Sequence, residues 1–121
     1  MKKILIVEDN SDTAKVLATK LEGAGFEIQT AADAAQGLTA AHQFRPHLIV
    51  LDLLIPGGGG ISLLKRLKLS VHTNTIPVMV LTGIEKDAEE DVRALGVQVY
   101  LRKPFDPQQV LEEIKRILGI T

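Results

Sequence analysis

The stretch Leu48-Ile49-Val50-Leu51-Asp52 decides the fold class, because an unbroken apolar run ends there in an acid. The run is too short for a helix, and it does not alternate apolar and polar residues. Continuous runs of branched apolar residues are typical of strands buried on both faces, as in a parallel sheet covered by helices. We therefore expect residues 48–51 to form a central strand and Asp52 to lie just beyond its carboxyl end.

Further apolar runs have the same character and predict further buried strands at Ile4–Val7, Val78–Leu81 and Val99–Leu101. Another segment, Phe26–Thr30, alternates apolar and polar side chains instead. Alternation indicates a strand that is covered on one face only. We therefore expect this segment to lie at an edge of the sheet.

Segments with the periodicity of a helix lie between these strands. They predict helices over residues 12–22, 33–44, 61–69, 85–95 and 107–118. In the first helix, we expect Val16, Leu17 and Leu21 to face the core. Asp33-x-x-Gln36 and Asp106-Pro107 are typical of helix starts. The strict alternation of strands and helices predicts an α/β sandwich with a parallel sheet and right-handed crossovers.

The composition fits one globular domain, which we expect to span residues 1–121. There are 14 basic and 15 acidic residues, so we expect no basic surface for direct contact with nucleic acid. The chain has no cysteine, which excludes disulfides, thiolate nucleophiles and cysteine zinc sites. No segment reaches the length of a membrane span, and Glu8 ends the first apolar run too early for a signal peptide. We therefore expect a cytoplasmic protein that contacts no membrane.

Polar side chains follow the predicted buried strands at their carboxyl ends. They are Glu8 and Asp9 after the first run, then Asp52, Thr82 and Lys103 after the later ones. The carboxyl ends of parallel strands meet at one edge of the sheet, where α/β proteins bind their ligands. We therefore expect these side chains to lie close together.

Three carboxylates at one edge repel each other unless a proton or a cation holds them together. Oxygen ligands without histidine or cysteine suit a hard ion, and a few carboxylates with room for water suit Mg²⁺ better than Ca²⁺. Mg²⁺ also organises phosphoryl transfer, and a carboxylate can then act as the nucleophile and become an aspartyl phosphate. Lys103 can pair with the new phosphoryl oxygens, and Thr82 can donate a hydrogen bond to them.

Four segments in this order resemble the response-regulator receiver domain of two-component signalling, and the resemblance covers the whole chain. They are Ile4-Leu5-Ile6-Val7-Glu8-Asp9, Leu51-Asp52-Leu53-Leu54-Ile55-Pro56, Leu81-Thr82-Gly83 and Tyr100-Leu101-Arg102-Lys103-Pro104-Phe105. Each segment alone is a weak signal, but all four at the ends of successive strands form a specific pattern. The resemblance implies a flavodoxin-like (βα)5 three-layer sandwich whose sheet has the strand order 2-1-3-4-5.

The resemblance also implies roles for the polar residues. Asp52 accepts a phosphoryl group from a histidine kinase or a phosphotransfer protein, and Lys103 contacts that group. Asp9 and Asp52 bind Mg²⁺ directly, Glu8 binds it through water, and the backbone carbonyl of Leu54 completes the protein ligands. The domain is therefore expected to be a signalling switch that assists its own phosphorylation and dephosphorylation, and not an enzyme.

The same resemblance makes Thr82 and Tyr100 a switch pair, in which Thr82 moves toward the phosphoryl group and Tyr100 turns inward. The surface that responds would comprise the fourth helix, the fifth strand and the fifth helix, at residues 85–95, 99–101 and 107–118. This surface would act on an effector protein or domain, and the domain could also form a homodimer. Family members have a cis peptide bond before the proline that corresponds to Pro104, and an X-Pro bond can adopt it at modest cost.

The chain departs from the family pattern beside the expected phosphorylation site. Gly58 and Gly59 occupy places where the family has a bulky apolar residue and an acid, so we expect the loop Gly57–Gly60 to be unusually mobile. Many DNA-binding members carry two acids before the switch aromatic, whereas this chain has Gln98 and Val99. That difference disfavours the dimer of that subfamily.

Leu54 and Ile84 bear on the lifetime of the phosphoryl group, because the corresponding family residues flank the path of the hydrolytic water. They lie two positions beyond Asp52 and Thr82, and both are apolar. Neither side chain can orient a water molecule by hydrogen bonding. We therefore expect a long-lived phosphoryl state.

Two other interpretations use the same residues. The chain could be a module that binds partners without phosphorylation, which only the glycine loop favours. A phosphatase resembling the haloacid dehalogenase group would need a cap domain and a second acid where Leu54 stands. The remaining chemical candidates are His42, His47 and His72, which share no ligand spacing, so we expect surface positions and not a metal site.

Overall fold

The computed structural model describes residues 1–57, 59–83 and 89–120. Within them, a 5-stranded sheet has the order β2-β1-β3-β4-β5, and every neighbouring pair is parallel. The strands are β1 Lys3–Val7, β2 Glu27–Ala31, β3 Leu48–Leu51, β4 Val78–Thr82 and β5 Val99–Arg102. This order, alternating with helices, confirms the predicted flavodoxin-like fold and places the weak alternating strand at an edge.

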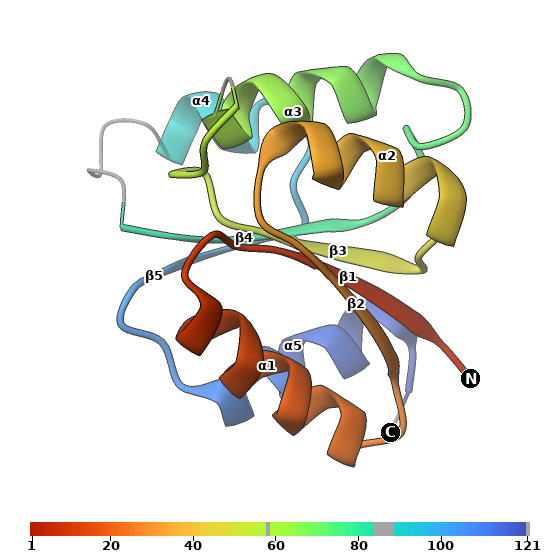
Figure 1. The fold of residues 1–121 in the computed structure, drawn as a ribbon, viewed down its shortest axis with the longest axis vertical. Helices are drawn as coiled ribbons and strands as arrows, with labels where there is room; N and C mark the ends of the chain where they lie inside the picture. The colour runs from red at the N-terminus through yellow and green to blue at the C-terminus, as the bar shows by residue number, and fades with distance from the viewer. Residues whose placement is uncertain (58, 84–88, 121) are drawn as a thin grey trace.

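The helices cover both faces of the sheet and make a three-layer sandwich. They are α1 Ser11–Gly23, α2 Ala34–Phe44, α3 Gly59–Leu69, α4 Glu89–Arg93 and α5 Pro107–Leu118. Figure 1 shows α1 and α5 on one face and α2, α3 and α4 on the other. The crossover helices therefore bury both faces of the central strands, as the unbroken apolar runs require.

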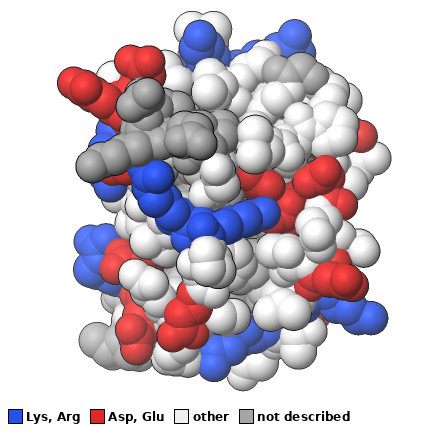
Figure 2. Space-filling view, turned by 90° about the vertical axis from the view of Figure 1, so that its left-hand side faces the viewer, with Lys and Arg blue, Asp and Glu red and all other residues white. Residues whose placement is uncertain are grey.

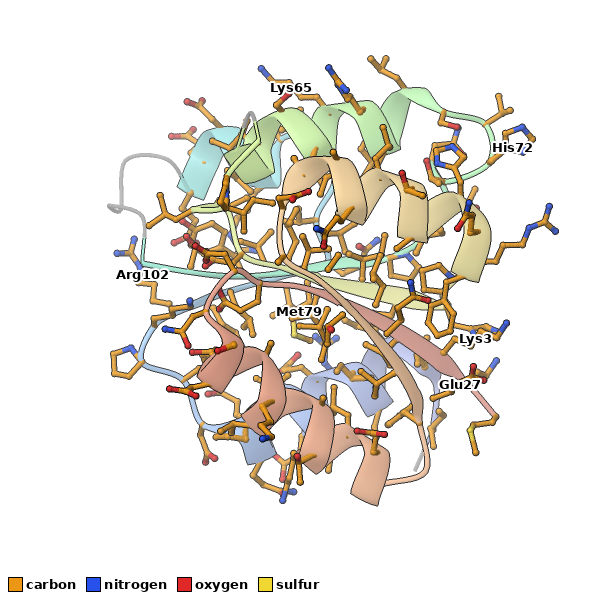
Figure 3. The ribbon with its side chains drawn as sticks, viewed as in Figure 1. Lys3, Glu27, Lys65, His72, Met79 and Arg102 are labelled. Carbon is orange, nitrogen blue, oxygen red and sulfur yellow. The ribbon has the colours of Figure 1, made fainter. Side chains whose placement is uncertain are left out.

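The core is divided into two layers by the sheet, and β1 contributes to both. Ile4 and Ile6 pack in the layer under α1 and α5, together with Met79, which Figure 3 labels there. Leu5 and Val7 pack in the layer under α2, α3 and α4. Successive side chains of a strand point to opposite faces, and helices cover both faces here, so these four side chains of β1 are at most 1% exposed.

The predicted helix starts are confirmed by their caps. Asp33 Oδ1 accepts a hydrogen bond from the Gln36 backbone N–H at 2.7 Å, and Gln36 Oε1 accepts one from the backbone N–H of Ala32 at 3.1 Å. Asp106 Oδ1 accepts one from the Gln108 N–H at 3.0 Å. These bonds satisfy backbone donors that have no partner within the helix.

The prediction that Val16 faces the core is wrong. Its side chain is 52% exposed, while α1 buries Ala14, Leu17 and Leu21. With 3.6 residues per turn, positions 14, 17 and 21 lie along one stripe, and position 16 falls well away from it. The sequence pattern therefore located the helix correctly but placed one apolar residue on the wrong face.

Two helix starts differ from the prediction or cannot be compared with it. Helix α3 begins at Gly59 and not at Ile61, so two residues of the predicted loop belong to the helix. The described part of α4 is Glu89–Arg93. The predicted start of that helix at residue 85, and Ile84 before it, lie outside the described residues.

The longest described helix, α1, has 13 residues. No helix in the described part of the chain is both long enough and apolar enough to cross a membrane.

Candidate functional site

The backbone at the carboxyl edge of the sheet is held by hydrogen bonds that extend the strand ladders. The Glu8 N–H donates to the Ala31 carbonyl, the Asp52 N–H to the Val7 carbonyl, and the Lys103 N–H to the Thr82 carbonyl, each at 2.9 Å. The first residue after each of these strands is therefore fixed as firmly as the strand itself. This places acidic and basic side chains at defined positions on one edge.

Three carboxylates meet at this edge, as the sequence predicts. Glu8 and Asp52 are 5% and 4% exposed, and Asp9 is exposed. One oxygen from each lies within 4.8 Å of the others. Figure 2 looks onto this edge, where acidic side chains gather and a basic side chain extends toward them. We call Glu8, Asp9 and Asp52 the acidic cluster.

Lys103 reaches into the acidic cluster from the end of β5. Its Nζ lies 2.6 Å from Glu8 Oε1 and 3.0 Å from Asp52 Oδ2. Burial by itself lowers the pKa of Lys103, but the hydrogen bonds and charges of Glu8 and Asp52 outweigh it, so the pKa is raised. Lys103 is therefore a fixed positive charge that neutralises part of the cluster.

The remaining charge imbalance falls on Glu8. Burial raises the pKa of Glu8, the hydrogen bond from Lys103 lowers it, and the nearby Asp52 raises it again; the net pKa is above the ordinary 4.5. The charged form of Glu8 is thus less favourable in the folded state than in the unfolded chain. A divalent cation at the cluster would relieve this penalty.

We expect Glu8→Gln to raise the free energy of unfolding at neutral pH in the absence of Mg²⁺. Because the folded-state pKa of Glu8 is raised, Glu8 becomes protonated in the folded protein as the pH falls toward 4.5. Its unfavourable contribution to the free energy of unfolding is then lost. The difference between Glu8→Gln and wild type should therefore shrink over the same interval. Urea unfolding measured across pH checks this, with Glu27→Gln on the edge strand (Figure 3) as a matched control. If the wild type were more stable than Glu8→Gln at neutral pH, the pKa of Glu8 would not be raised in the folded state.

Backbone donors complete the surroundings of the buried carboxylates. The Leu54 N–H donates to Asp52 Oδ1 at 3.0 Å, and the Asn10 N–H donates to Glu8 Oε2 at 3.3 Å. Each oxygen of Asp52 therefore has a partner on this chain. The Leu54 side chain itself is 57% exposed.

The backbone next to Asp52 is packed against the start of α3 in a way that only glycine permits. The Gly60 N–H donates to the Leu53 carbonyl at 2.9 Å. A Cβ on Gly60 would overlap Leu53 Cα and approach the Asp52 carbonyl oxygen to 2.6 Å. Gly57 and Gly59 have φ of 81° and 83°, in the left-handed region that favours glycine. Gly60 therefore has a steric role beside Asp52, which the sequence did not reveal.

The two predicted switch residues occupy different environments. Thr82 is fully buried at the end of β4. Tyr100 packs in the layer under α2, α3 and α4 and is 6% exposed. Its hydroxyl has no hydrogen-bond partner among the described residues, and burial raises its pKa. The Arg93 guanidinium lies 5.9 Å from the centre of the Tyr100 ring.

The structure thus brings Glu8, Asp9, Asp52 and Lys103 together, as predicted. Thr82 is joined to them through its carbonyl, which accepts the Lys103 N–H. Tyr100 stands apart, on the strand position paired with Val80. The predicted cis bond is present between Lys103 and Pro104.

The chain is thus an α/β sandwich with a buried aspartate, two further acids and a lysine at the carboxyl edge of its sheet. The family model of the response regulator receiver domain matches residues 4–115. The chain therefore belongs to the response regulator receiver domain family of two-component systems.

Curated relatives include the DNA-binding dual master transcriptional regulator RpaA of Synechocystis, which is 33% identical over 123 residues. The phosphate regulon transcriptional regulatory protein PhoB of Pseudomonas aeruginosa is 36% identical over 124 residues. These matches cover 100% and 99% of this chain but 51% and 53% of the relatives. The chain thus spans about half the length of the curated relatives it matches.

Solved structures with the same fold include a putative response regulator of Chloroflexus aurantiacus, with a TM-score of 0.90 and 34% identity. The receiver domain of the sensor histidine kinase PA1611 of Pseudomonas aeruginosa has a TM-score of 0.88 and 26% identity, and it is described with a magnesium ion coordinated in the active site cleft. Each match covers 98% of this chain and 98% of the other.

Proposed function

We propose that this domain accepts a phosphoryl group on Asp52 in a Mg²⁺-dependent reaction and thereby switches a binding surface. The observation that carries the proposal is the position of the Asp52 carboxylate. It is almost fully buried, it lies in the acidic cluster, and its Oδ2 is 3.0 Å from Lys103 Nζ. Family membership alone would also be compatible with a receiver domain that has lost its acidic residues and lysine. This chain retains the acidic cluster and Lys103.

The donor set of the acidic cluster fits Mg²⁺, because it offers only oxygen ligands and one exposed carboxylate that leaves room for water. In the proposed site, Asp9 and Asp52 hold the ion directly, Glu8 holds it through water, and the Leu54 carbonyl completes the set. A bound Mg²⁺ would neutralise the charge that develops on the phosphoryl oxygens. The magnesium described in the PA1611 receiver domain supports this choice of ion.

The proposed step forms a bond between an Asp52 carboxylate oxygen and the phosphorus of a phosphohistidine on the kinase or phosphotransfer protein. The phosphorus–nitrogen bond breaks, and the histidine nitrogen keeps the electron pair and takes up a proton. Lys103 then pairs with a phosphoryl oxygen, for which it is already placed beside Asp52. Thr82 donates a hydrogen bond to another phosphoryl oxygen. The domain is a switch and not an enzyme, because its own side chain is the acceptor.

The switching surface in this proposal comprises α4, β5 and α5. Glu89 pairs with Arg93 within α4 at 2.8 Å and with Arg102 of β5 at 3.6 Å, so it links the helix to the strand. The Arg93 guanidinium also lies over the Tyr100 ring of β5. The Arg93 hydrogen bond is the main cause that holds the pKa of Glu89 below its ordinary value. Phosphorylation would favour one packing of Tyr100 and these contacts over another, which is a shift between two populations.

The proposed partners are a histidine kinase or phosphotransfer protein upstream and an effector protein or domain downstream, acting in the cytoplasm. The curated relatives are named as transcriptional regulators and are about twice as long as this chain. An effector region of that kind is a proposed output, reached through α4, β5 and α5, with a homodimer as one form of that contact. A long-lived phosphoryl state, from the apolar Leu54, belongs to the same proposal; its second determinant, Ile84, lies outside the described residues.

The phosphorylation-independent module is the second candidate. Its single support is the unusual glycine loop, yet Gly60 fits closely against Leu53 and Asp52. The glycine at position 60 is therefore compatible with an intact backbone at Asp52. We therefore rank this candidate below the phosphoacceptor.

Removal of Mg²⁺ tests the proposed chemistry. We expect EDTA to slow the reaction of the protein with acetyl phosphate at least about 100-fold. Without Mg²⁺, the transition state loses a positive charge that would stabilise the phosphoryl oxygens. Renewed addition of Mg²⁺ should restore the rate, and Asp9→Asn should raise the Mg²⁺ concentration that is needed. Undiminished phosphorylation in EDTA would refute a Mg²⁺-dependent mechanism.

A further inference from the structure

A pair of histidines lies at the amino edge of the sheet, remote from the acidic cluster. His42 is in the last turn of α2, and His72 is in the turn that follows α3. Their ring centres are 6.2 Å apart, and both side chains are exposed. Figure 3 shows His72 and Arg102 at opposite ends of the molecule, with Arg102 at the carboxyl edge. The pair is therefore separate from the proposed phosphoacceptor site.

The hydrogen bonds of His42 determine which of its ring nitrogens can bind a ligand. His42 Nδ1 lies 2.9 Å from the Leu38 carbonyl oxygen, which can only accept, so Nδ1 carries the hydrogen. In the neutral ring, Nε2 then carries the lone pair that can accept a hydrogen bond or bind a ligand. Nε2 lies 3.3 Å from Ser70 Oγ, and the same Oγ accepts the backbone N–H of His72 at 3.3 Å. The Ser70 hydroxyl therefore donates to His42 Nε2, and a bound metal ion would displace this hydroxyl, which can rotate away.

The Nδ1 hydrogen bond of His42 is of the kind that metal-binding histidines have in proteins. A ligating histidine nearly always donates its other ring N–H to a carbonyl or carboxylate, which fixes the tautomer and the ring orientation. Two imidazoles on one zinc ion, with Zn–N near 2.1 Å, have ring centres roughly 5 to 6 Å apart. The observed 6.2 Å is close to that range, and His72 lies on a turn, so a small shift of its side chain suffices.

We propose that His42 and His72 form a binding site for a divalent transition metal ion, with Zn²⁺ as the representative ion. Imidazole ligands suit Zn²⁺, Cu²⁺ and Ni²⁺ and not Mg²⁺, so the two ends of the domain would select different ions. The rings line a pocket of about 450 Å³ that Arg45 also lines. Arg45 disfavours a bare cation there, so the remaining metal positions suit water or an anionic group. With two protein ligands, the site should bind more weakly than a four-ligand structural zinc site.

His47 provides a matched control, because it is exposed but has the opposite hydrogen bonding. Its Nδ1 accepts the backbone N–H of Lys3 at 3.0 Å. The hydrogen of the neutral ring is then on Nε2, and the one lone pair accepts a backbone N–H, which cannot rotate away as the Ser70 hydroxyl can. His47 should therefore contribute nothing to binding.

Calorimetric titration of the whole chain with Zn²⁺, in excess Mg²⁺ to occupy the acidic cluster, tests the proposal. We expect one Zn²⁺ per chain, a loss of affinity of at least about tenfold in both His42→Ala and His72→Ala, and no change in His47→Ala. Imidazole nitrogen NMR should show the shift at Nε2 of His42. Absence of binding by the wild type, binding that survives either substitution, or equal loss in His47→Ala would overturn the proposal. If circular dichroism shows that His42→Ala is unfolded, His72→Ala and the NMR shift decide.

Discussion

Substitution of Gly60 by alanine is expected to lower the free energy of unfolding by at least about 2 kcal/mol. The new Cβ would overlap Leu53 Cα and lie 2.6 Å from the Asp52 carbonyl oxygen. Both are backbone atoms, and the Gly60 N–H bond to Leu53 holds them in place. The clash therefore cannot be relieved by rotating a side chain, and either α3 or the 52–53 backbone must move.

Gly23→Ala is the matched control for Gly60→Ala, and its effect should have the opposite sign. Gly23 is the last residue of α1, and a Cβ there would meet nothing within 4 Å. Alanine in a helix is favoured over glycine by up to about 1 kcal/mol. Urea unfolding followed by circular dichroism measures both variants. Equal stability of Gly60→Ala and Gly23→Ala would show that the start of α3 is not packed as closely on Asp52 as the structure has it.

Substitution of Lys103 by methionine is expected to slow phosphoryl transfer to Asp52 by roughly 100- to 1,000-fold. Removal of one preorganised charge or donor from a transition-state contact has an effect of that size. Mg²⁺ binding should persist or become tighter, because the ammonium that competes for Glu8 and Asp52 is gone. Loss of transfer with retained Mg²⁺ binding separates Lys103 from the proposed metal ligands, whose substitution should impair both.

The control for Lys103→Met is Arg102→Met, which removes the neighbouring positive charge. Arg102 pairs with Glu89 at 3.6 Å, and the structure gives it no contact with the acidic cluster. We expect phosphorylation of Arg102→Met to proceed at nearly the wild-type rate. If Lys103→Met and Arg102→Met behaved alike, the net charge of this edge would matter and not the specific position of Lys103. Quenched-flow or mass measurements of the phosphorylated fraction give both rates.

The sequence predicted the fold because each central strand is an unbroken apolar run. Such runs specify burial on both faces, and burial on both faces of alternating strands specifies a parallel sheet between helices. The acidic cluster followed from the same reasoning, because the residues after parallel strands must share an edge. The position of Glu8, Asp52 and Lys103 directly after predicted strands was sufficient to predict that they lie close together.

Other features depend on distances that a linear pattern does not contain. The periodicity of α1 did not distinguish Val16 from the stripe of Ala14, Leu17 and Leu21, because adjacent apolar residues blur the helical face. The steric role of Gly60 depends on how closely α3 approaches Leu53. The sequence favoured only loop mobility there, which stays a prediction, and Gly58 lies outside the described residues.

The histidine pair is a further case in which sequence spacing gave no signal. His42 and His72 belong to different βα units, and only the packing of α2 beside the turn after α3 brings their rings together. The prediction that the histidines lie at the surface is confirmed, since His42, His47 and His72 are all exposed. The pair differs from His47 in the nearness of the two rings and in the hydrogen bonding of His42, which become visible only in three dimensions.

The intact mass of the protein after incubation with acetyl phosphate and Mg²⁺, measured beside Asp52→Asn, tests the central claim most directly. We predict that the wild type gains the mass of one phosphoryl group and that Asp52→Asn gains none. A phosphorylated histidine kinase replaces acetyl phosphate if the small donor proves unreactive. If wild type and Asp52→Asn gained phosphate equally, Asp52 would not be the acceptor. If the wild type gained none from either donor, this domain would not work by phosphorylation.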